Sequence, residues 1–221
     1  MKSLIIFDLD GTLLDTVADL AASTNYALSL CGFPTHETAA YRFFVGNGIN
    51  KLFERALPEN SRTQEKILEI RQHFLKYYGA HNSELTVPYP GILELLNELQ
   101  TSGIKLAVAS NKYQEATKVL IKHFFPDIEF VAVFGQRDNI PVKPDPTIVY
   151  DILKIAKKEK SNVLYVGDSG VDMQTAQTAG VDACGVTWGF RPRSELEVFS
   201  PKHIVDKPTE IWKIIFSNNY F

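Results

Sequence analysis

The chain has little of what would tie it to a disulfide framework, a membrane or a nucleic acid. Its 221 residues include two cysteines, Cys31 and Cys184, in no CxxC or Cys/His cluster, which excludes a disulfide scaffold and argues against zinc. No apolar run approaches a membrane span, and the run before Asp8 is too short for a signal peptide. A net charge of −3 offers no basic surplus. We therefore expect a cytoplasmic protein with no nucleic-acid or membrane partner.

Short apolar runs that end at a polar residue or a glycine recur along the chain. They occupy residues 4–7, 106–109, 130–134 and 163–166. Because they are apolar throughout, they suit strands buried on both faces of a parallel sheet. Helical patterns lie between them, at residues 91–101, 113–125 and 146–158. The alternation of strand and helix predicts an α/β doubly wound fold with a parallel sheet.

Residues 16–86 interrupt this alternation. Helical patterns occur at residues 16–31, 36–44, 47–57 and 63–79, with no convincing strand among them. We therefore predict an all-helical domain of residues 16–86, inserted after the first strand. The core domain would then consist of residues 1–15 and 87–221.

Polar residues follow the predicted strands. Asp8, Ser110 and Asp168 each stand at the end of an apolar run, and Lys143 lies on a later loop. Ligands of open parallel sheets bind at the carboxyl ends of the strands, so we expect these four side chains to converge there. Carboxylates, a hydroxyl and a lysine together suit a phosphate group and a metal ion.

The segment Asp8-Leu9-Asp10-Gly11-Thr12 has two interpretations. A carboxylate just past a strand can act as a nucleophile and form an aspartyl-phosphate, while a second carboxylic acid nearby protonates the leaving oxygen. Gly11 would let the backbone turn sharply beside a phosphate. The same residues can also form a plain turn with solvated aspartates, because such sequences are common in loops.

Four motifs in order resemble those of the haloacid dehalogenase superfamily of phosphohydrolases. FDLDGTLLDT resembles the first, Ser110-Asn111-Lys112 the second, Lys143-Pro144 the third, and Gly167-Asp168-Ser169 with Asp172 the fourth. The resemblance spans the chain, and the helical insertion stands where the C1-type cap of that superfamily belongs. The phosphoglycolate phosphatase subfamily is resembled in particular by DLAASTNYALSLCGFP, FVGNGINKLFERALP, KPDP and GDSGVDMQTAQTAGV.

The resemblance implies a Rossmann-like core and Mg²⁺-dependent hydrolysis of a phosphate monoester. Asp8 would be the nucleophile, and Asp10 would protonate the leaving group and then deprotonate the attacking water. Lys143 would neutralise the phosphate and orient Asp8. The Asp8 and Asp168 side chains and the Asp10 backbone carbonyl would hold Mg²⁺, a hard cation that prefers oxygen ligands.

Ser110 and Asn111 are expected to bind the phosphate. Ser110 would donate its hydroxyl and Asn111 its backbone N–H, although Ser110 also suits the cap of a helix at 113–125. Asp172 has two interpretations as well. It completes an S-x-x-D capping box, and by resemblance it is a direct metal ligand or a residue that supports the ligands.

The Gly46-Asn47-Gly48 segment lies in the helical insertion. It is interpreted either as a loop that closes over the site, with Asn47 or the backbone N–H groups touching the leaving group, or as a plain turn between helices.

A helical cap implies a small, soluble phosphate ester as the partner, and phosphoglycolate is the substrate that the resemblance favours. The alternatives are a sugar phosphomutase and a phosphatase or pyrophosphatase of another substrate. A dehalogenase does not need Asp10, and a binding module would be expected to have lost Asp8, Asp10 or Asp168, whereas all three are present. We expect a monomer or a homodimer.

Overall fold

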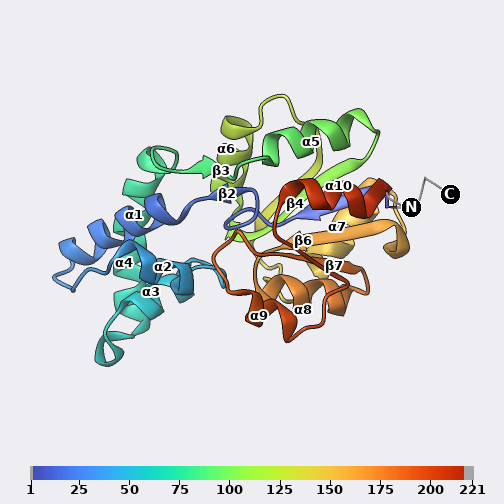
Figure 1. The fold of residues 1–221 in the computed structure, drawn as a ribbon. Helices are drawn as coiled ribbons and strands as arrows, with labels where there is room; N and C mark the ends of the chain where they lie inside the picture. The colour runs from blue at the N-terminus through green and yellow to red at the C-terminus, as the bar shows by residue number, and fades with distance from the viewer. Residues whose placement is uncertain (1, 217–221) are drawn as a thin grey trace.

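The computed structural model describes residues 2–216 and contains one six-stranded sheet in those residues, with neighbouring strands parallel (Figure 1). Its strands are β1 (Leu4–Phe7), β4 (Lys105–Tyr113), β5 (Phe130–Gln136), β6 (Val163–Gly167), β7 (Asp182–Val186) and β8 (His203–Val205). The spatial order is β5-β4-β1-β6-β7-β8, so β1 lies in the middle with β4 and β6 beside it. The predicted doubly wound α/β fold is confirmed.

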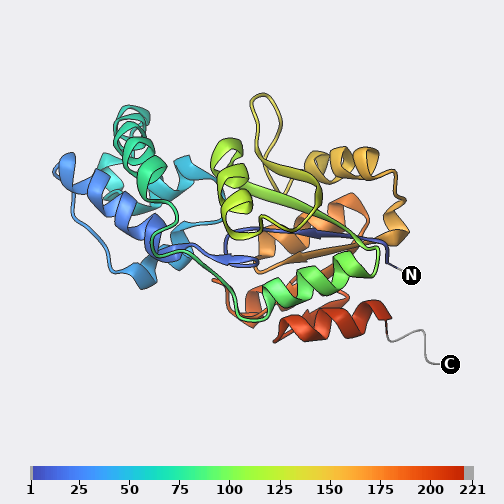
Figure 2. The same cartoon turned by 90° about the horizontal axis from the view of Figure 1, so that it is seen from above.

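Helices cover both faces of the sheet. Alternate residues of β1 point to opposite sides, so Ile5 and Phe7 belong to one apolar cluster and Leu4 and Ile6 to another. The first cluster includes residues of α5 (Ile92–Thr101), α6 (Gln114–Phe124) and α10 (Pro208–Phe216), and the second includes residues of α7 (Thr147–Ala156), α8 (Gly170–Ala179) and α9 (Arg193–Glu197). Figure 2 shows α5 in green and α10 in red side by side on one face. Burial on both faces explains the continuously apolar strands.

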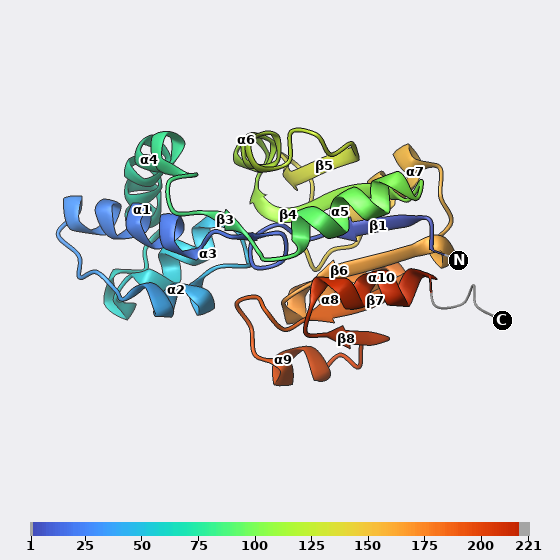
Figure 3. The ribbon, with the colours of Figure 1, turned by 45° about the horizontal axis from the view of Figure 1, so that its top comes forward.

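The segment between β1 and α5 is helical, as expected. Its helices are α1 (Val17–Leu30), α2 (Thr38–Phe44), α3 (Ile49–Ala56) and α4 (Gln64–His81). They pack around an apolar cluster of their own and lie beyond one end of the sheet (Figure 3). A short antiparallel pair, β2 (Leu14–Asp15) with β3 (Val87–Pro88), connects them to the core. The domain bounds at 15/16 and 86/87 stay a prediction.

Two features of the sheet differ from the sequence prediction. The run expected to end at residue 109 continues as β4 to Tyr113, where it pairs with Gln136 of β5 after a register shift. Ser110 therefore lies inside a strand, and its interpretation as a cap of the next helix is wrong, since Tyr113 takes that position. The second difference is that β7 and β8, which lie outside the apolar runs used to predict strands, complete the sheet on one side.

None of the helices within residues 2–216 combines the length and the apolar character needed to cross a bilayer. Cys31 and Cys184 are both free thiols, so the chain uses no disulfide in its described part. The cytoplasmic location and the monomeric or homodimeric state stay predictions.

Candidate active site

Asp8 stands at the carboxyl end of β1. Its backbone N–H donates to Val166 O at 2.9 Å, so the pairing of β1 with β6 fixes where its side chain begins. The residue is 8% exposed. Beyond it the chain turns through Gly11, whose φ of +87° lies in the left-handed region, and a Cβ there would collide with the carboxylate of Asp168. Glycine therefore lets the loop after β1 pass close to the end of β6.

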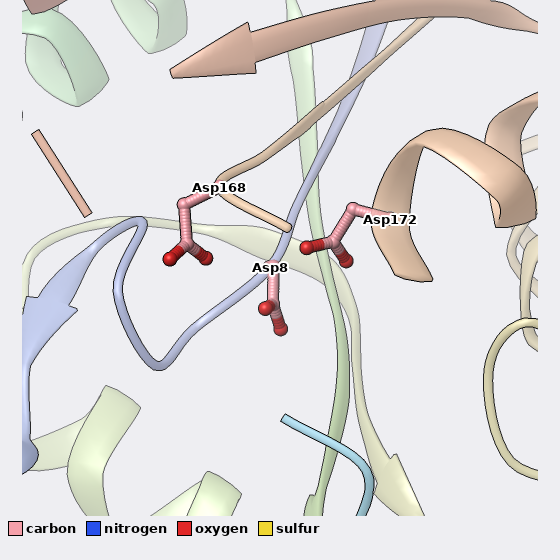
Figure 4. Close-up of side chains that lie close together, drawn as sticks. All are labelled: Asp8, Asp168 and Asp172. Carbon is pink, nitrogen blue, oxygen red and sulfur yellow. The ribbon is translucent and has the colours of Figure 1, made fainter. Parts of the chain in front are cut away.

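Asp168 follows β6, the neighbour of β1. Its Oδ2 accepts a hydrogen bond from the Phe190 N–H at 2.7 Å, and its Oδ1 accepts one from Thr12 Oγ1 at 3.3 Å. Figure 4 shows the carboxylates of Asp168 and Asp172 on either side of Asp8. Strand order thus brings together carboxylates that are 160 residues apart in the chain.

Lys143, on the loop between β5 and α7, reaches into this group from β4's side of the sheet. The residue is 3% exposed. Its Nζ lies 2.9 Å from Asp8 Oδ1 and donates to Asp172 Oδ1 at 2.7 Å and to the Ala109 carbonyl at 2.9 Å. A buried ammonium with carboxylate partners on two sides is held in one place, which is what a phosphate-binding cation beside a nucleophile requires.

Asp172 forms the capping box that its position in the sequence indicated, and it also contacts Lys143. It forms a capping box with Ser169 at the start of α8, and its Oδ2 accepts from Ser169 Oγ at 2.6 Å. Its Oδ1 faces Lys143. Because its Oδ1 lies 2.7 Å from the Lys143 ammonium, a contact that Asp168 does not make, Asp172 is better suited to orient Lys143 than to bind a metal directly.

Ser110 and Asn111 come from the last part of β4. Ser110 is 2% exposed, and its Oγ accepts from the Lys112 N–H at 3.2 Å, which leaves its hydroxyl proton for another acceptor. The Asn111 side chain accepts from the Lys143 N–H at 2.8 Å and donates to the carbonyls of Lys143 and Gly46, both at 3.0 Å. That side chain therefore holds the Lys143 loop and the cap loop, and a phosphate contact is left to the Asn111 backbone.

Lys112 is a site residue to which sequence reasoning assigned no role. Its Nζ lies 3.1 Å from Asp10 Oδ1, and Thr16 Oγ1 donates to the same oxygen at 2.7 Å. Lys112 and Thr16 thus hold the Asp10 carboxylate in place, apart from the cluster of Asp8, Asp168 and Asp172. The signal that was available is the position of Lys112 two residues after Ser110, which places it near the carboxyl end of the same strand.

The cap loop runs from α2 to α3 and lies over the core. Gly46 and Gly48 have φ values of +113° and +85°, which favour glycine at both positions. The Asn47 Oδ1 accepts from Arg55 Nη2 at 2.7 Å, and Asn47 does not line the cavity, whereas both glycines do. The structure therefore brings the loop to the site but keeps the Asn47 side chain on Arg55.

A cavity lies between the cap and the carboxyl ends of β1 and β4. The empty space within it is about 520 Å³, part of it open to solvent. Asp8, Asp10 and Ser110 line its core side. Its cap side is mainly apolar, formed by Leu20, Val45, Ile49, Leu52, Phe74 and Tyr78.

Burial and mutual repulsion raise the pKa values of two of the acidic groups, Asp8 and Asp168. Burial and the Asp172 carboxylate raise the pKa of Asp8 from 3.8 to about 7, against the opposing effect of Lys143. Burial, Asp172 and Asp8 likewise raise the pKa of Asp168 well above its ordinary value. Burial lowers the pKa of Lys143, but the Asp172 and Asp8 carboxylates outweigh it and raise that pKa. Burial together with repulsion among the aspartates therefore outweighs the attraction of the lysine.

The donor set fits a divalent cation. Asp8, Asp168 and Asp172 have carboxylate oxygens within 4.8 Å of one another, and hard cations such as Mg²⁺ prefer oxygen ligands. Asp8 Oδ1 is buried and accepts no hydrogen bond within the described chain, although it lies in ionic contact with Lys143. A buried carboxylate oxygen whose lysine partner is shared with a second carboxylate, in a crowded acidic cluster, is where a metal ion would add stabilising charge.

Three comparisons with known proteins point to the same family of hydrolases. The family model described as haloacid dehalogenase-like hydrolase matches residues 5–186. A phosphoglycolate phosphatase of Mesorhizobium japonicum is 32% identical over 210 residues, covering 92% of this chain and 90% of that protein. One of Vibrio parahaemolyticus is 30% identical, covering 96% of this chain and 95% of that protein. The crystal structure of a predicted phosphoglycolate phosphatase from Haemophilus somnus has a TM-score of 0.90 at 30% identity, with 97% of this chain and 98% of that chain covered.

Proposed function

Because the chain belongs to the haloacid dehalogenase-like hydrolases and is a phosphatase, we propose that it hydrolyses phosphoglycolate through an aspartyl-phosphate on Asp8. The observation that carries the covalent mechanism is the buried Asp8 carboxylate, which lines the cavity with one oxygen 2.9 Å from Lys143 Nζ. The choice of substrate is supported by relatives that are named phosphoglycolate phosphatases.

In the first step, a carboxylate oxygen of Asp8 attacks phosphorus and the bond from phosphorus to the ester oxygen breaks. Asp10 donates a proton to the departing alkoxide. Thr16 holds the Asp10 carboxyl group through a 2.7 Å hydrogen bond, and Asp10 lines the same cavity as Asp8. A single substrate can therefore meet the nucleophile at phosphorus and the acid at the leaving oxygen.

In the second step, water attacks phosphorus and the bond to the Asp8 oxygen breaks. Asp10, now ionised, takes the proton from the water, so the carboxyl group returns to its starting state. Lys143 neutralises the phosphate oxygens, and the Ser110 hydroxyl and the Asn111 backbone N–H donate to them. The capping box and Lys143 engage both Asp172 oxygens, so Asp172 keeps the ammonium in position throughout.

We propose that the Asp8 and Asp168 side chains and the Asp10 backbone carbonyl hold Mg²⁺. When bound, the ion would supply the positive charge that offsets repulsion between Asp8 and the phosphate. The fit rests on the crowded carboxylates, and on the buried Asp8 oxygen whose lysine partner is shared with Asp172.

The cap would exclude bulk water and limit the size of the leaving group. Its apolar side chains face the cavity, and the Gly46-Asn47-Gly48 loop borders it. Since Arg55 engages the Asn47 side chain and the two glycines of this loop line the cavity, we propose that the loop contacts the leaving group through the backbone N–H groups of Gly46 and Gly48.

A panel of phosphate esters tests the proposed function. With Mg²⁺ present, we expect kcat/KM for phosphoglycolate to exceed that for sugar phosphates by about tenfold or more, with one inorganic phosphate released per ester. Phosphate release that requires a sugar bisphosphate would favour a phosphomutase. A higher kcat/KM for another ester would contradict the choice of phosphoglycolate while leaving the phosphatase mechanism in place.

The raised pKa of Asp8 predicts how stability depends on pH in the metal-free protein. Between pH 3.8 and about 7 the folded chain keeps a proton on Asp8 that the unfolded chain has lost, so the free energy of unfolding should fall as the pH rises through this window. The fall should approach ~1.4 kcal/mol per pH unit at most for this single group. Urea denaturation in a chelator at pH 5 and pH 8 measures it.

The Asp8→Asn variant is the control for this prediction, because it removes the titrating group and keeps the shape. Its free energy of unfolding should fall less between pH 5 and pH 8 than that of the wild type. Mg²⁺ should also stabilise the wild type more at pH 8 than at pH 5, since at pH 5 the ion must displace a proton. Equal pH dependence in the two proteins would contradict the assignment.

A further inference from the structure

The cavity contains a cation that the proposed chemistry does not use. Among the described residues that line it, Lys112 is the only lysine or arginine. Its side chain is 4% exposed, and the hydrogen bonds described for its ammonium group both go to Asp10. An ammonium group can donate three hydrogen bonds, so Lys112 can serve a ligand while it remains beside Asp10.

A buried hydroxyl group lies close to this cation. Tyr78, on α4 of the cap, is fully buried and lines the same cavity, and its hydroxyl lies within reach of the Lys112 ammonium but forms no well-aligned hydrogen bond in the described chain. The Lys112 ammonium lies 4.9 Å from the centre of the Tyr78 ring. An ammonium group can only donate to this oxygen, so the hydroxyl proton of Tyr78 remains available for a ligand atom in the cavity.

The other nearby cations are already engaged. Lys143 contacts Asp8 and Asp172 on the phosphate side of the site. Arg55 donates to Asn47 and to the Phe44 carbonyl, which places it in the cap loop rather than in the cavity. An anionic group on the leaving side of the substrate therefore has Lys112 as its available charged partner among the described cavity residues.

We propose that Lys112 and Tyr78 bind the carboxylate of the leaving group and so select phosphate esters of small 2-hydroxy acids. This inference rests on the proposed function and adds the residues that recognise the substrate. The ester oxygen must reach Asp10 to receive its proton, and in phosphoglycolate the carboxylate carbon is two bonds from that oxygen. A cation 3.1 Å from Asp10 Oδ1 is therefore where the carboxylate needs one.

The two groups come from different parts of the chain. Lys112 belongs to β4 of the core and Tyr78 to α4 of the cap, and they lie side by side, so the carboxylate would contact both where the core meets the cap. An ester without the anionic group would bring no hydrogen-bond acceptor to the buried ammonium and the buried hydroxyl, so it should bind more weakly. Recognition of this one functional group is thereby shared between the core and the cap.

The test compares phosphoglycolate with its carboxamide analogue, in which a neutral amide replaces the carboxylate. The measured quantity is the ratio of kcat/KM for the acid to kcat/KM for the amide, in wild type, Tyr78→Phe and Lys112→Met. We expect Tyr78→Phe to lower this ratio about tenfold and Lys112→Met to lower it about 100-fold, because hydrogen bonds to charged groups are the stronger ones. Lys112→Met should also slow both substrates through Asp10, and the ratio separates the two effects.

Tyr89→Phe is the matched control. The Tyr89 hydroxyl is also buried without a partner in the described chain, but Tyr89 does not line the cavity, so its loss should leave the ratio unchanged. Tyr78→Phe removes a single hydroxyl oxygen and should fold. It therefore decides the test if Lys112→Met fails to fold. Ratios in Tyr78→Phe and Lys112→Met equal to that of the wild type would overturn this inference alone. A wild type with no preference for the acid would overturn it together with phosphoglycolate as the substrate.

Discussion

Replacing Asp8 by asparagine should lower kcat for p-nitrophenyl phosphate by about 10⁴-fold or more, because the variant has no nucleophile that can form an acyl-phosphate. The fold should be retained. Burial and Asp172 already favour the neutral form of Asp8, raising its pKa to about 7, and asparagine is neutral with nearly the same shape. In a chelator at pH 8, the free energy of unfolding of the variant should therefore equal or exceed that of the wild type.

The control for this experiment is Asp127→Asn, the same chemical change at an exposed residue on the loop between α6 and β5. It should change neither activity nor stability measurably. Turnover of Asp8→Asn within tenfold of the wild type would contradict covalent catalysis by Asp8. Circular dichroism reports the fold directly, so it distinguishes a variant that has lost its nucleophile from one that has lost its structure.

Removing divalent metal should lower kcat by about 10³-fold or more, and adding Mg²⁺ back should restore it. The reason is the charge of the site. Four carboxylates and two ammonium groups give a formal charge of −2 when all are ionised; these groups are Asp8, Asp10, Asp168, Asp172, Lys112 and Lys143. When no divalent metal ion is bound, a phosphate dianion that approaches this negatively charged site is repelled by the nucleophile that it must reach.

The measurement is the rate of phosphate release in excess chelator and after titration with Mg²⁺. Asp168→Asn should require a higher Mg²⁺ concentration for half-maximal activity, whereas Asp206→Asn, at an exposed position, should respond as the wild type does. Full activity in excess chelator would defeat the metal assignment.

Local patterns were enough to predict the elements that carry the site. The continuously apolar run before Asp8 indicated a strand buried on both faces, and β1 is such a strand. The S-x-x-D pattern of Ser169 and Asp172 predicted a capping box, which the start of α8 contains. The end of β4 was missed because Ser110, Asn111 and Lys112 are polar, and only pairing with β5 keeps them in a strand.

The partners of individual side chains were harder to predict. The phosphate contact predicted for the Asn111 backbone N–H stays a prediction, and the sequence did not indicate that the Asn111 side chain is engaged by the backbone of Lys143 and Gly46. Apart from its place two residues after Ser110, nothing local distinguishes Lys112 from a solvated lysine at the end of a strand. Its burial depends on Tyr78 of the cap and on Asp10 of a neighbouring strand's loop.

Hydrophobic periodicity and the spacing of short motifs act over a few residues, and they alone determined the alternation of strands and helices, the helical insertion and the residues capable of phosphoryl chemistry. Tertiary structure decided which of these residues meet. The pairing of Lys112 with Asp10, the burial of the Tyr78 hydroxyl and the double role of Asp172 all depend on strand order and on where the cap rests. Contacts between residues far apart in the chain are set by packing of whole elements, and local sequence does not encode them.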